Sequence, residues 1–210
     1  MRALSEQRES KGRLLVATTN TGKLREIRSL LADVPMELVT LRDLPPLEEP
    51  EETGLTFEEN ARLKALYYFA HSGMTTVAED SGLVIDGLDG EPGVRSARFL
   101  RPDASYPERF AEIFRRLAGP PEQDRAARFV CTLAVADAGE IIYEARGIVE
   151  GEIAHEARGS AGFGYDPIFY YPPYGSTLAD VTEDAKLAVA HRGQAFRKLA
   201  SWLSALHTSR

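Results

Sequence analysis

The chain has 210 residues, of which 43% are hydrophobic and 27% are charged, so it has enough apolar material for a sizeable core and bulk disorder is excluded. Asp and Glu outnumber Lys and Arg by 32 to 25, and the formal net charge of -7 would repel nucleic acid and anionic membrane surfaces. A polyanionic ligand must therefore be met by a local basic pocket.

The cysteine count and the N-terminal segment restrict the class of protein further. Cys131 is the only cysteine, which excludes an intramolecular disulfide and a Cys-rich metal site and fits a reducing, cytoplasmic compartment. Residues 1–12 hold no apolar run of signal-peptide length, and we expect them to form a flexible tail. The longest apolar runs, at 14–17 and 65–70, fall far short of the roughly 18 residues that a membrane span requires, so no membrane partner is expected.

The first part of the chain predicts alternating strands and helices. Residues 14–17 form an apolar run typical of a strand, residues 24–31 have helical spacing, and residues 36–40 alternate as a second strand. Prolines and glutamates over 45–52 predict an exposed acidic loop. The capping-box spacing of Thr56 and Glu59 then predicts a helix from Phe57 to about His71.

The second part mixes antiparallel pairing with these units. Residues 75–78 predict a short strand that delivers Glu79, Asp80 and Ser81 into a glycine-containing stretch that cannot be helical. A helix is expected over 107–117 and a long hairpin over 126–136 and 140–149. A final helical region covers about 183–206, and the fold class is therefore α/β with a mixed sheet.

A polar loop lies between the first strand and the first helix. Its residues are Thr18, Thr19, Asn20, Thr21, Gly22 and Lys23. Free backbone N–H groups and the helix dipole favour an anion here, and a capped loop with a solvated lysine is an equally open alternative. The segment is not a Walker A loop, because the first glycine of that pattern is missing and Leu24 stands where Ser or Thr should bind magnesium.

Acidic residues supply the second candidate site. Glu79 and Asp80 stand beside the small residues Ser81 and Gly82, and carboxylates of this kind suit Mg²⁺ bridged to phosphates. An acid-rich surface turn is the alternative. Glu52, in the acidic loop, is a weaker candidate of the same sort.

Two further segments suggest a nucleotide. Phe163 lies between two glycines before Tyr165 and Asp166, which exposes its ring for stacking on a base, although ordinary turns use the same pattern. Lys186 and His191 would be about 140° apart on one continuous helix, so they face one pocket only if the helix breaks near Gly193 or the side chains reach around it. A solvated cationic face, with Arg192, is the alternative.

In combination and order, five segments resemble the inosine/xanthosine triphosphate pyrophosphatase family, which clears non-standard purine nucleoside triphosphates. They are LLVATTNTGKLREI at 14–27, ETGLTFEENARLKA at 52–65, AEDSGLVIDGLDGEPGVRSARF at 78–99, GFGYDPIF at 162–169 and AVAHRGQAF at 188–196. The resemblance implies an elongated mixed sheet flanked by helices, with two lobes and a central substrate cleft in one domain over 13–210. It also implies a homodimer and an Mg²⁺-dependent reaction that yields a nucleoside monophosphate and pyrophosphate.

The resemblance also implies roles. Thr18, Asn20 and Lys23 are similar to the residues that bind the triphosphate in this family, and Lys64 is similar to a lysine near the phosphates. Glu52 and Asp80 are similar to the residues around the metal and the attacking water, with Asp80 as the general base. Asn60 is equally compatible with a structural role. The residues similar to the nucleotide-binding set are Ser81, Phe163, Gly164, Tyr165, Asp166, Lys186, His191 and Arg192. Glu79 departs from the pattern, since relatives commonly have a second Asp there.

The implied reaction is in-line attack of water on the α-phosphorus, with Mg²⁺ and lysines neutralising the charge of the leaving pyrophosphate. A donor such as Arg192 or a loop N–H would donate a hydrogen bond to the 6-oxo group of hypoxanthine or xanthine, whereas the 6-amino group of adenine would face it as a second donor. Two alternatives stay open. One is a related pyrophosphatase for pyrimidine or modified nucleotides, and the other is a nucleotide-binding sensor without turnover.

Overall fold

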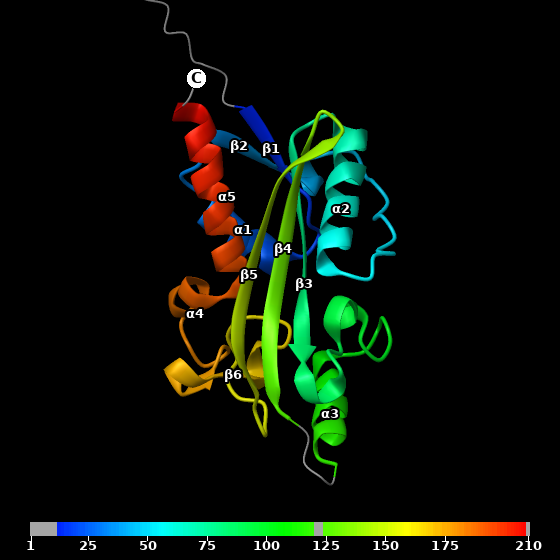
Figure 1. Cartoon of the computed structure of the whole chain (residues 1–210), viewed down its shortest axis with the longest axis vertical. Coiled ribbons are helices and arrows are strands. Elements are labelled where there is room, and N and C mark those ends of the chain that lie inside the picture. The colour runs from blue at the N-terminus through cyan, green and yellow to red at the C-terminus, as the bar shows by residue number, and fades with distance from the viewer. Residues whose placement is uncertain (1–11, 120–123, 209–210) are drawn as a thin grey trace, which may run out of the picture.

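A curled seven-stranded sheet forms the backbone of an elongated molecule in the computed structural model, which describes residues 12–119 and 124–208 (Figure 1). The strand order is β2-β1-β3-β4-β5-β6-β7; β1 pairs in parallel with β2 and β3, and the other neighbours are antiparallel. The strands are β1 Gly12–Val16, β2 Met36–Thr40, β3 Thr76–Ile85, β4 Ala126–Asp137, β5 Glu140–Ile153, β6 Phe169–Tyr171 and β7 Ser176–Thr177. The predicted mixed α/β class is confirmed.

Helices cover both faces of this sheet. The α-helices are α1 Thr21–Leu30, α2 Phe57–Ser72, α3 Tyr106–Leu117, α4 Glu183–Val189 and α5 His191–Thr208. Short 3-10 helices are η1 Leu41–Asp43, η2 Asp86–Leu88, η3 Gly93–Arg98, η4 Asp166–Ile168 and η5 Pro172–Tyr174. In the part of the chain that the structure describes, each helix is too short or too polar to cross a bilayer. Of the predicted tail over 1–12, only Gly12 is described, and it begins β1.

Local sequence signals set the helix ends. The Thr56 side chain accepts from the Glu59 amide while Glu59 accepts from the Thr56 amide, which is the expected capping box at the start of α2. Gly73 then ends the helix in the left-handed conformation that glycine adopts without strain. The acidic loop before α2 is irregular, as predicted. Its end is fixed by two hydrogen bonds, one from the Gly54 amide to Asn60 Oδ1 and one from Asn60 Nδ2 to Gly54 O.

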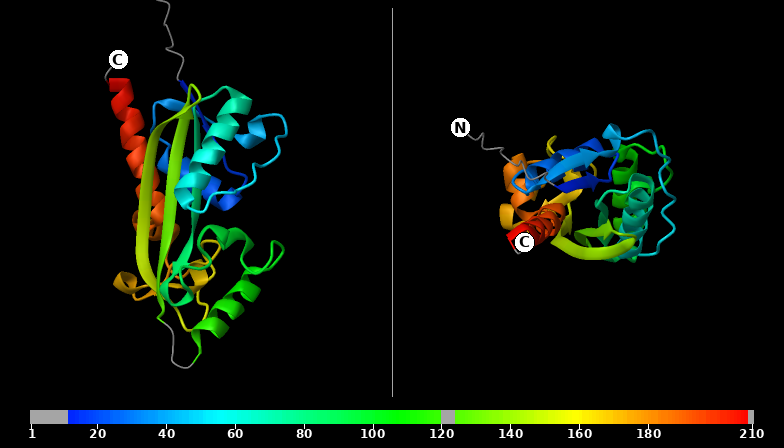
Figure 2. Two further views of the ribbon diagram at one scale, coloured as in Figure 1. Left: turned by 45° about the vertical axis from the view of Figure 1, so that its right-hand side comes forward. Right: turned by 90° about the horizontal axis from the view of Figure 1, so that it is seen from above.

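Alternation along β4 distributes the core between the two faces. Cys131, Leu133 and Val135 pack with α1 and α5, whereas Ala134 and Ala136 pack with α2 on the opposite face. Figure 2, seen from above, shows α2 and α5 on opposite sides of the curled sheet. We call this region the upper lobe. A third cluster, containing Ile168 and residues of α3, β6 and the far ends of β3–β5, forms the lower lobe.

One predicted boundary was wrong. β3 does not end at residue 78 but pairs with β4 as far as Ile85, so Glu79 and Asp80 lie within the strand. Gly82 lies inside this strand and allows a close approach: a Cβ there would lie 2.4 Å from Gly93 O, so its absence lets η3 pack on the strand. The last helical region breaks at Ala190, close before Gly193, which meets the condition under which Lys186 and His191 can face one pocket.

Candidate active site

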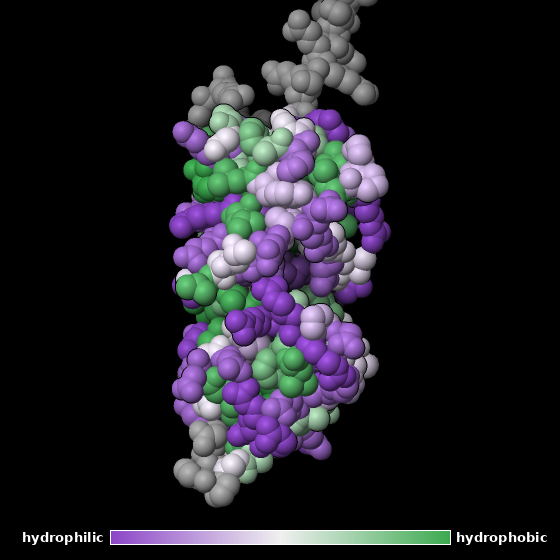
Figure 3. All heavy atoms as spheres, turned by 90° about the vertical axis from the view of Figure 1, so that its right-hand side faces the viewer, coloured by the Kyte–Doolittle hydropathy of each residue, from purple (hydrophilic) through white to green (hydrophobic). Residues whose placement is uncertain are grey.

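A cavity of about 630 Å³ lies between the two lobes, and it collects the predicted segments. Its opening is visible as a hollow rimmed by hydrophilic residues about halfway along one face (Figure 3). The predicted site residues in its wall are Thr18, Thr19, Asn20, Lys23, Glu52, Lys64, Ser81, Phe163, Gly164, Tyr165, Asp166, Lys186, His191 and Arg192. Glu79 also lines it, whereas Thr21, Gly22 and Asp80 lie just outside its wall.

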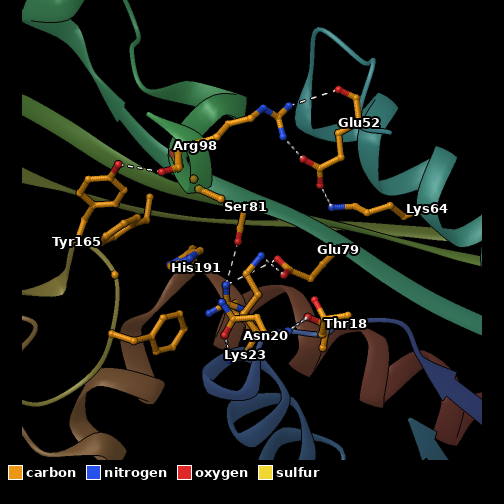
Figure 4. Close-up of a pocket in the computed structure, with 18 of the residues that line it drawn as sticks. Thr18, Asn20, Lys23, Glu52, Lys64, Glu79, Ser81, Arg98, Tyr165 and His191 are labelled. Carbon is orange, nitrogen blue, oxygen red and sulfur yellow. Dashed lines mark hydrogen bonds and ion pairs between the residues drawn. The ribbon is translucent and has the colours of Figure 1, made fainter. Parts of the chain in front are cut away.

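The polar loop after β1 is a capped helix start whose lysine is not solvated. Asn20 accepts from the Lys23 amide at 3.0 Å and caps α1, and its own amide donates to Thr18 Oγ1 at 3.3 Å. The Lys23 ammonium turns into the cavity and forms an ion pair with Glu79 at 2.5 Å (Figure 4). Gly22 is needed for close approach, because a Cβ there would lie 2.9 Å from the Phe163 ring.

Glu79 is a fully buried carboxylate held by two cations. Lys23 contacts one of its oxygens, and the Arg192 guanidinium lies 3.7 Å from the other. Burial acts to raise the pKa of Glu79, but the charges of Lys23 and Arg192 outweigh it and lower the pKa well below the usual value. Glu79 is therefore a permanent anion at the back of the cavity.

Asp80, the next residue on β3, is on the other side of the strand. Its oxygens contact Lys64 Nζ at 3.1 Å and accept from Asn60 Nδ2 at 3.2 Å. Burial raises the pKa of Asp80, and the nearby Lys64 charge only partly offsets that effect. Asn60 is itself fully buried and also binds Gly54, so it serves as a structural group and as a support for Asp80.

Glu52 and Lys64 line the cavity on the side of β3 where Asp80 lies. Lys64 Nζ lies 2.7 Å from Glu52 Oε1, so one ammonium group bridges Glu52 and Asp80. Burial acts to raise the pKa of Glu52, but Lys64 and Arg98 outweigh it and lower the pKa. In Figure 4, Glu52, Lys64 and Arg98 form one connected group above Ser81.

A buried charge network forms the other end of the cavity. Lys186 Nζ contacts Glu26 at 2.9 Å and Asp166 at 2.6 Å, and Arg192 donates to the second Glu26 oxygen at 2.6 Å. Arg192 also donates to Ser81 Oγ at 2.9 Å. The alternative of a solvated cationic face is wrong, because the break at Ala190 turns both cations inward.

Phe163 is held against these cations. Asp166 accepts from the Phe163 amide at 2.8 Å, and Lys186 Nζ lies 4.5 Å from the centre of the Phe163 ring. Tyr165 is buried and donates to Ser96 O at 2.8 Å, so it supports the wall rather than presenting its hydroxyl. His191 stacks on Phe129 at 4.9 Å, and burial lowers its pKa well below the usual value, so the ring is neutral at neutral pH.

The sequence of this chain is similar to those of known proteins over most of its length. Residues 14–202 match the model of the Ham1 family. The chain belongs to this family. It is 45% identical over 187 residues to the dITP/XTP pyrophosphatase of an Exiguobacterium species, a match that covers 89% of this chain and 94% of the relative. It is 44% identical to the dITP/XTP pyrophosphatase of Geobacter sulfurreducens, covering 91% and 96%.

Solved structures of the Ham1 family have the same fold. The HAM1 protein from Coxiella burnetii superposes with a TM-score of 0.84 at 37% identity, covering 92% of this chain and 99% of that one. The Staphylococcus aureus Ham1 protein gives a TM-score of 0.82 at 33% identity, covering 94% and 100%. Both values are high enough to show a common architecture from end to end.

Two residues of this site were missed in the sequence. Glu26 is buried between Lys186 and Arg192. The sequence indicates its burial only through its position on the same helix as Lys23, three residues earlier, and beside the apolar Ile27. Arg98 reaches Glu52 from the lower lobe, and nothing in its local sequence indicates that contact. Both depend on partners distant along the chain.

The residues present could supply some, but not all, of the ligands of a divalent metal. Glu52 and Asp80 both contact the Lys64 ammonium, so two carboxylates face a position where positive charge is already favoured. Mg²⁺ is usually held by one or two carboxylates together with substrate phosphates. Within residues 12–119 and 124–208, no group of three or more His, Cys, Asp or Glu side chains is arranged to hold a metal unaided.

Proposed function

We propose that this chain hydrolyses the non-standard purine nucleoside triphosphates ITP, dITP and XTP to the nucleoside monophosphate and pyrophosphate. The observation that carries the proposal is one cavity in which Lys23 and Lys64, beside two carboxylates, face an aromatic loop backed by buried cations. The names of the two relatives, both dITP/XTP pyrophosphatases, support the same activity. The enzyme is accordingly a hydrolase of nucleotide metabolism that removes non-standard purines.

Asp80 is the proposed general base. Burial raises its pKa toward neutral pH, which makes it a better proton acceptor for the attacking water. The contact with Lys64 orients the carboxylate and favours its ionised form. Lys23 and Lys64 bind the phosphates and offset the charge that develops as pyrophosphate leaves. The proposed phosphate contacts around them are Thr18, Thr19, Asn20, Thr21 and Gly22.

Mg²⁺ is the proposed cofactor, held by Glu52 and Asp80 together with the substrate. When bound, it would supply Lewis-acid stabilisation of phosphate charge and lower the pKa of water. Glu79 is assigned to the neutralisation of Lys23 and Arg192 instead, because both contacts hold it on the other side of β3. A homodimer is proposed from the family resemblance. A cytoplasmic location is proposed from Cys131, a free buried thiol that fits a reducing compartment.

The base is proposed to bind in the cavity beside Phe163, within reach of Arg192, which lies 5.5 Å from the centre of the Phe163 ring. Two Arg192 nitrogens already donate to Glu26 and Ser81, while Arg192 Nε has no hydrogen-bond partner among the described residues. A 6-oxo group accepts from such a donor, and the 6-amino group of adenine would face it as a second donor.

Pyrophosphate release from a panel of triphosphates tests this function. We expect ITP, dITP and XTP to be hydrolysed with kcat/KM values exceeding that of ATP by on the order of 10⁴. Asp80→Asn should bind ITP but lose about 10²–10⁴-fold in kcat, since it deletes the base and keeps the shape. Preference for pyrimidine triphosphates would favour the related pyrophosphatase, and tight binding without turnover by the parent enzyme would favour a sensor.

A further inference from the structure

Arg98 is a cavity cation that has no part in the mechanism above. It is the last residue of η3 in the lower lobe, and its guanidinium donates to Glu52 Oε2 at 2.7 Å and to Glu52 O at 3.4 Å (Figure 4). Lys64, from α2 in the upper lobe, occupies the other oxygen of the same carboxylate at 2.7 Å. One carboxylate therefore holds two cations that come from opposite lobes.

Among the described cations of the cavity, Arg98 is the one most accessible to a ligand. Its side chain is 40% exposed, against 20% for Lys23 and 13% for Lys64. Lys186 and Arg192 are 5% and 2% exposed and are fixed by buried carboxylates. Because the Arg98–Glu52 pair is partly exposed to solvent, Arg98 can exchange Glu52 for another anion with little cost in desolvation.

The base of this side chain is nevertheless fixed. Ser96, two residues earlier in η3, donates to Gly93 O at 2.7 Å and accepts from the Leu83 amide of β3 at 2.9 Å. Tyr165 donates to Ser96 O at 2.8 Å. The Arg98 backbone is thus anchored to the wall of the cavity while its guanidinium remains at the surface.

We propose that Arg98 exchanges Glu52 for the polyphosphate of the substrate and becomes a phosphate-binding residue supplied by the lower lobe, an inference that rests on the proposed function. A guanidinium binds phosphate oxygens in a bidentate manner, and the polyphosphate offers more negative charge than a carboxylate already shared with Lys64. Arg98 shares its partner with Lys64 rather than with the network behind Phe163. It therefore contacts the phosphates remote from the base, which leave as pyrophosphate.

Binding to the metal-free enzyme tests the proposal without turnover. Titration calorimetry in EDTA would compare inorganic tripolyphosphate with IMP for the parent, Arg98→Met and Arg98→Lys. The matched control is Arg95→Met, which removes the same charge from an exposed position of the same 3-10 helix. We expect Arg98→Met to weaken tripolyphosphate about tenfold and IMP less than about twofold, with Arg98→Lys between parent and Arg98→Met.

Other outcomes overturn the proposal. Equal weakening of tripolyphosphate and IMP by Arg98→Met would mean that Arg98 only shapes the cavity. Unchanged tripolyphosphate binding, or the same loss in Arg95→Met, would mean that Arg98 stays on Glu52 or acts only through net charge. Hydrolysis of ITP by the parent is measured separately, so failure of the proposed function is distinguished from failure of this inference.

Discussion

Glu79 and Asp80 are neighbours on one strand, yet their pKa values shift in opposite directions. Both are buried, which raises a carboxyl pKa, but Glu79 lies between Lys23 and Arg192 whereas the Lys64 charge beside Asp80 does not outweigh burial. The strand places consecutive side chains on opposite faces, so each carboxylate meets a different set of cations. One is fixed as an anion, and the other has the proton affinity expected of a base.

A pair of substitutions separates phosphate binding from base recognition. Lys23→Met should lower kcat/KM for ITP and ATP by a similar factor of about 10–100, because the lysine is proposed to bind the phosphates, which the two substrates have in common. Arg192→Lys keeps the charge beside Glu26 but loses the guanidinium, so the ratio of ITP to ATP efficiency should fall by about tenfold or more.

Steady-state kinetics with both substrates give the two ratios. The lysine variant of Arg192 is chosen because an alanine would leave Glu26 buried with less compensation and destabilise the fold. If Arg192→Lys lowers both efficiencies equally, recognition of the 6-oxo group moves to His191 or to the backbone donors of residues 163–166.

The buried, neutral His191 should make the free energy of unfolding depend on pH. Burial and the Arg192 charge hold its folded pKa well below the unfolded value of about 6.5, so below that pH the unfolded chain binds the extra proton. The free energy of unfolding should therefore fall as pH drops from 7.5 to 5.5. His191→Gln stays neutral and should lose about 1.3 kcal/mol less over that interval.

Urea unfolding of both proteins at the two pH values measures this difference. The carboxylates contribute equally to parent and variant, so they cancel in the comparison. Parallel losses of stability would show that His191 is protonated in the folded protein, which contradicts the buried, neutral ring described above.

At the scale of elements, the sequence predicted helices and turns correctly where the residues that determine them are close together in the chain. The capping box at Thr56, the turn between β4 and β5 and the apolar spacing of α1 lie within a few residues, and these predictions are confirmed. The length of β3 and the burial of Glu26 depend on partners that are distant in sequence, namely β4 paired with β3 and Lys186 against Glu26. Nothing in the local pattern distinguishes those residues from a turn and a solvated helix face.

The approach of α5 to β5 depends on one glycine. A Cβ on Gly147 would lie 2.0 Å from His191 O and 2.8 Å from Gln194 Cβ. Gly147→Ala must therefore push the start of α5 away from the sheet, and Arg192 moves with it. We expect a loss of about 2 kcal/mol or more in stability together with weaker IMP binding.

Gly119→Ala is the matched control, because the nearest atom to its added Cβ would be Arg116 O at 3.9 Å. Thermal unfolding and IMP titration should leave this control close to the parent. A Gly147→Ala protein with parental stability and IMP affinity would show that α5 adjusts without moving the site.

At the scale of the whole molecule, β4 joins the two lobes. Phe129 belongs to the lower-lobe cluster, while Leu133 and Ala134 belong to the two clusters of the upper lobe. β3 and β5 run beside β4 over most of its length, and Figure 1 shows all three crossing from one lobe to the other. A break between the lobes would have to interrupt these paired strands, so we expect residues 13–210 to unfold as one domain.

A core substitution in one lobe, observed from the other, tests this cooperativity. Ile168 is fully buried in the lower lobe, and Ile168→Ala should cost about 2–5 kcal/mol. Trp202, the only tryptophan, packs against the upper lobe on α5, beside Tyr143. If the lobes unfold together, the urea midpoint of Trp202 fluorescence must fall with that of the far-ultraviolet circular dichroism, since both report one transition. A Trp202 midpoint that stays at the parental value while circular dichroism loses a separate early phase would mean that the lobes are independent, and the continuous strands would then have to fray at the level of the cavity.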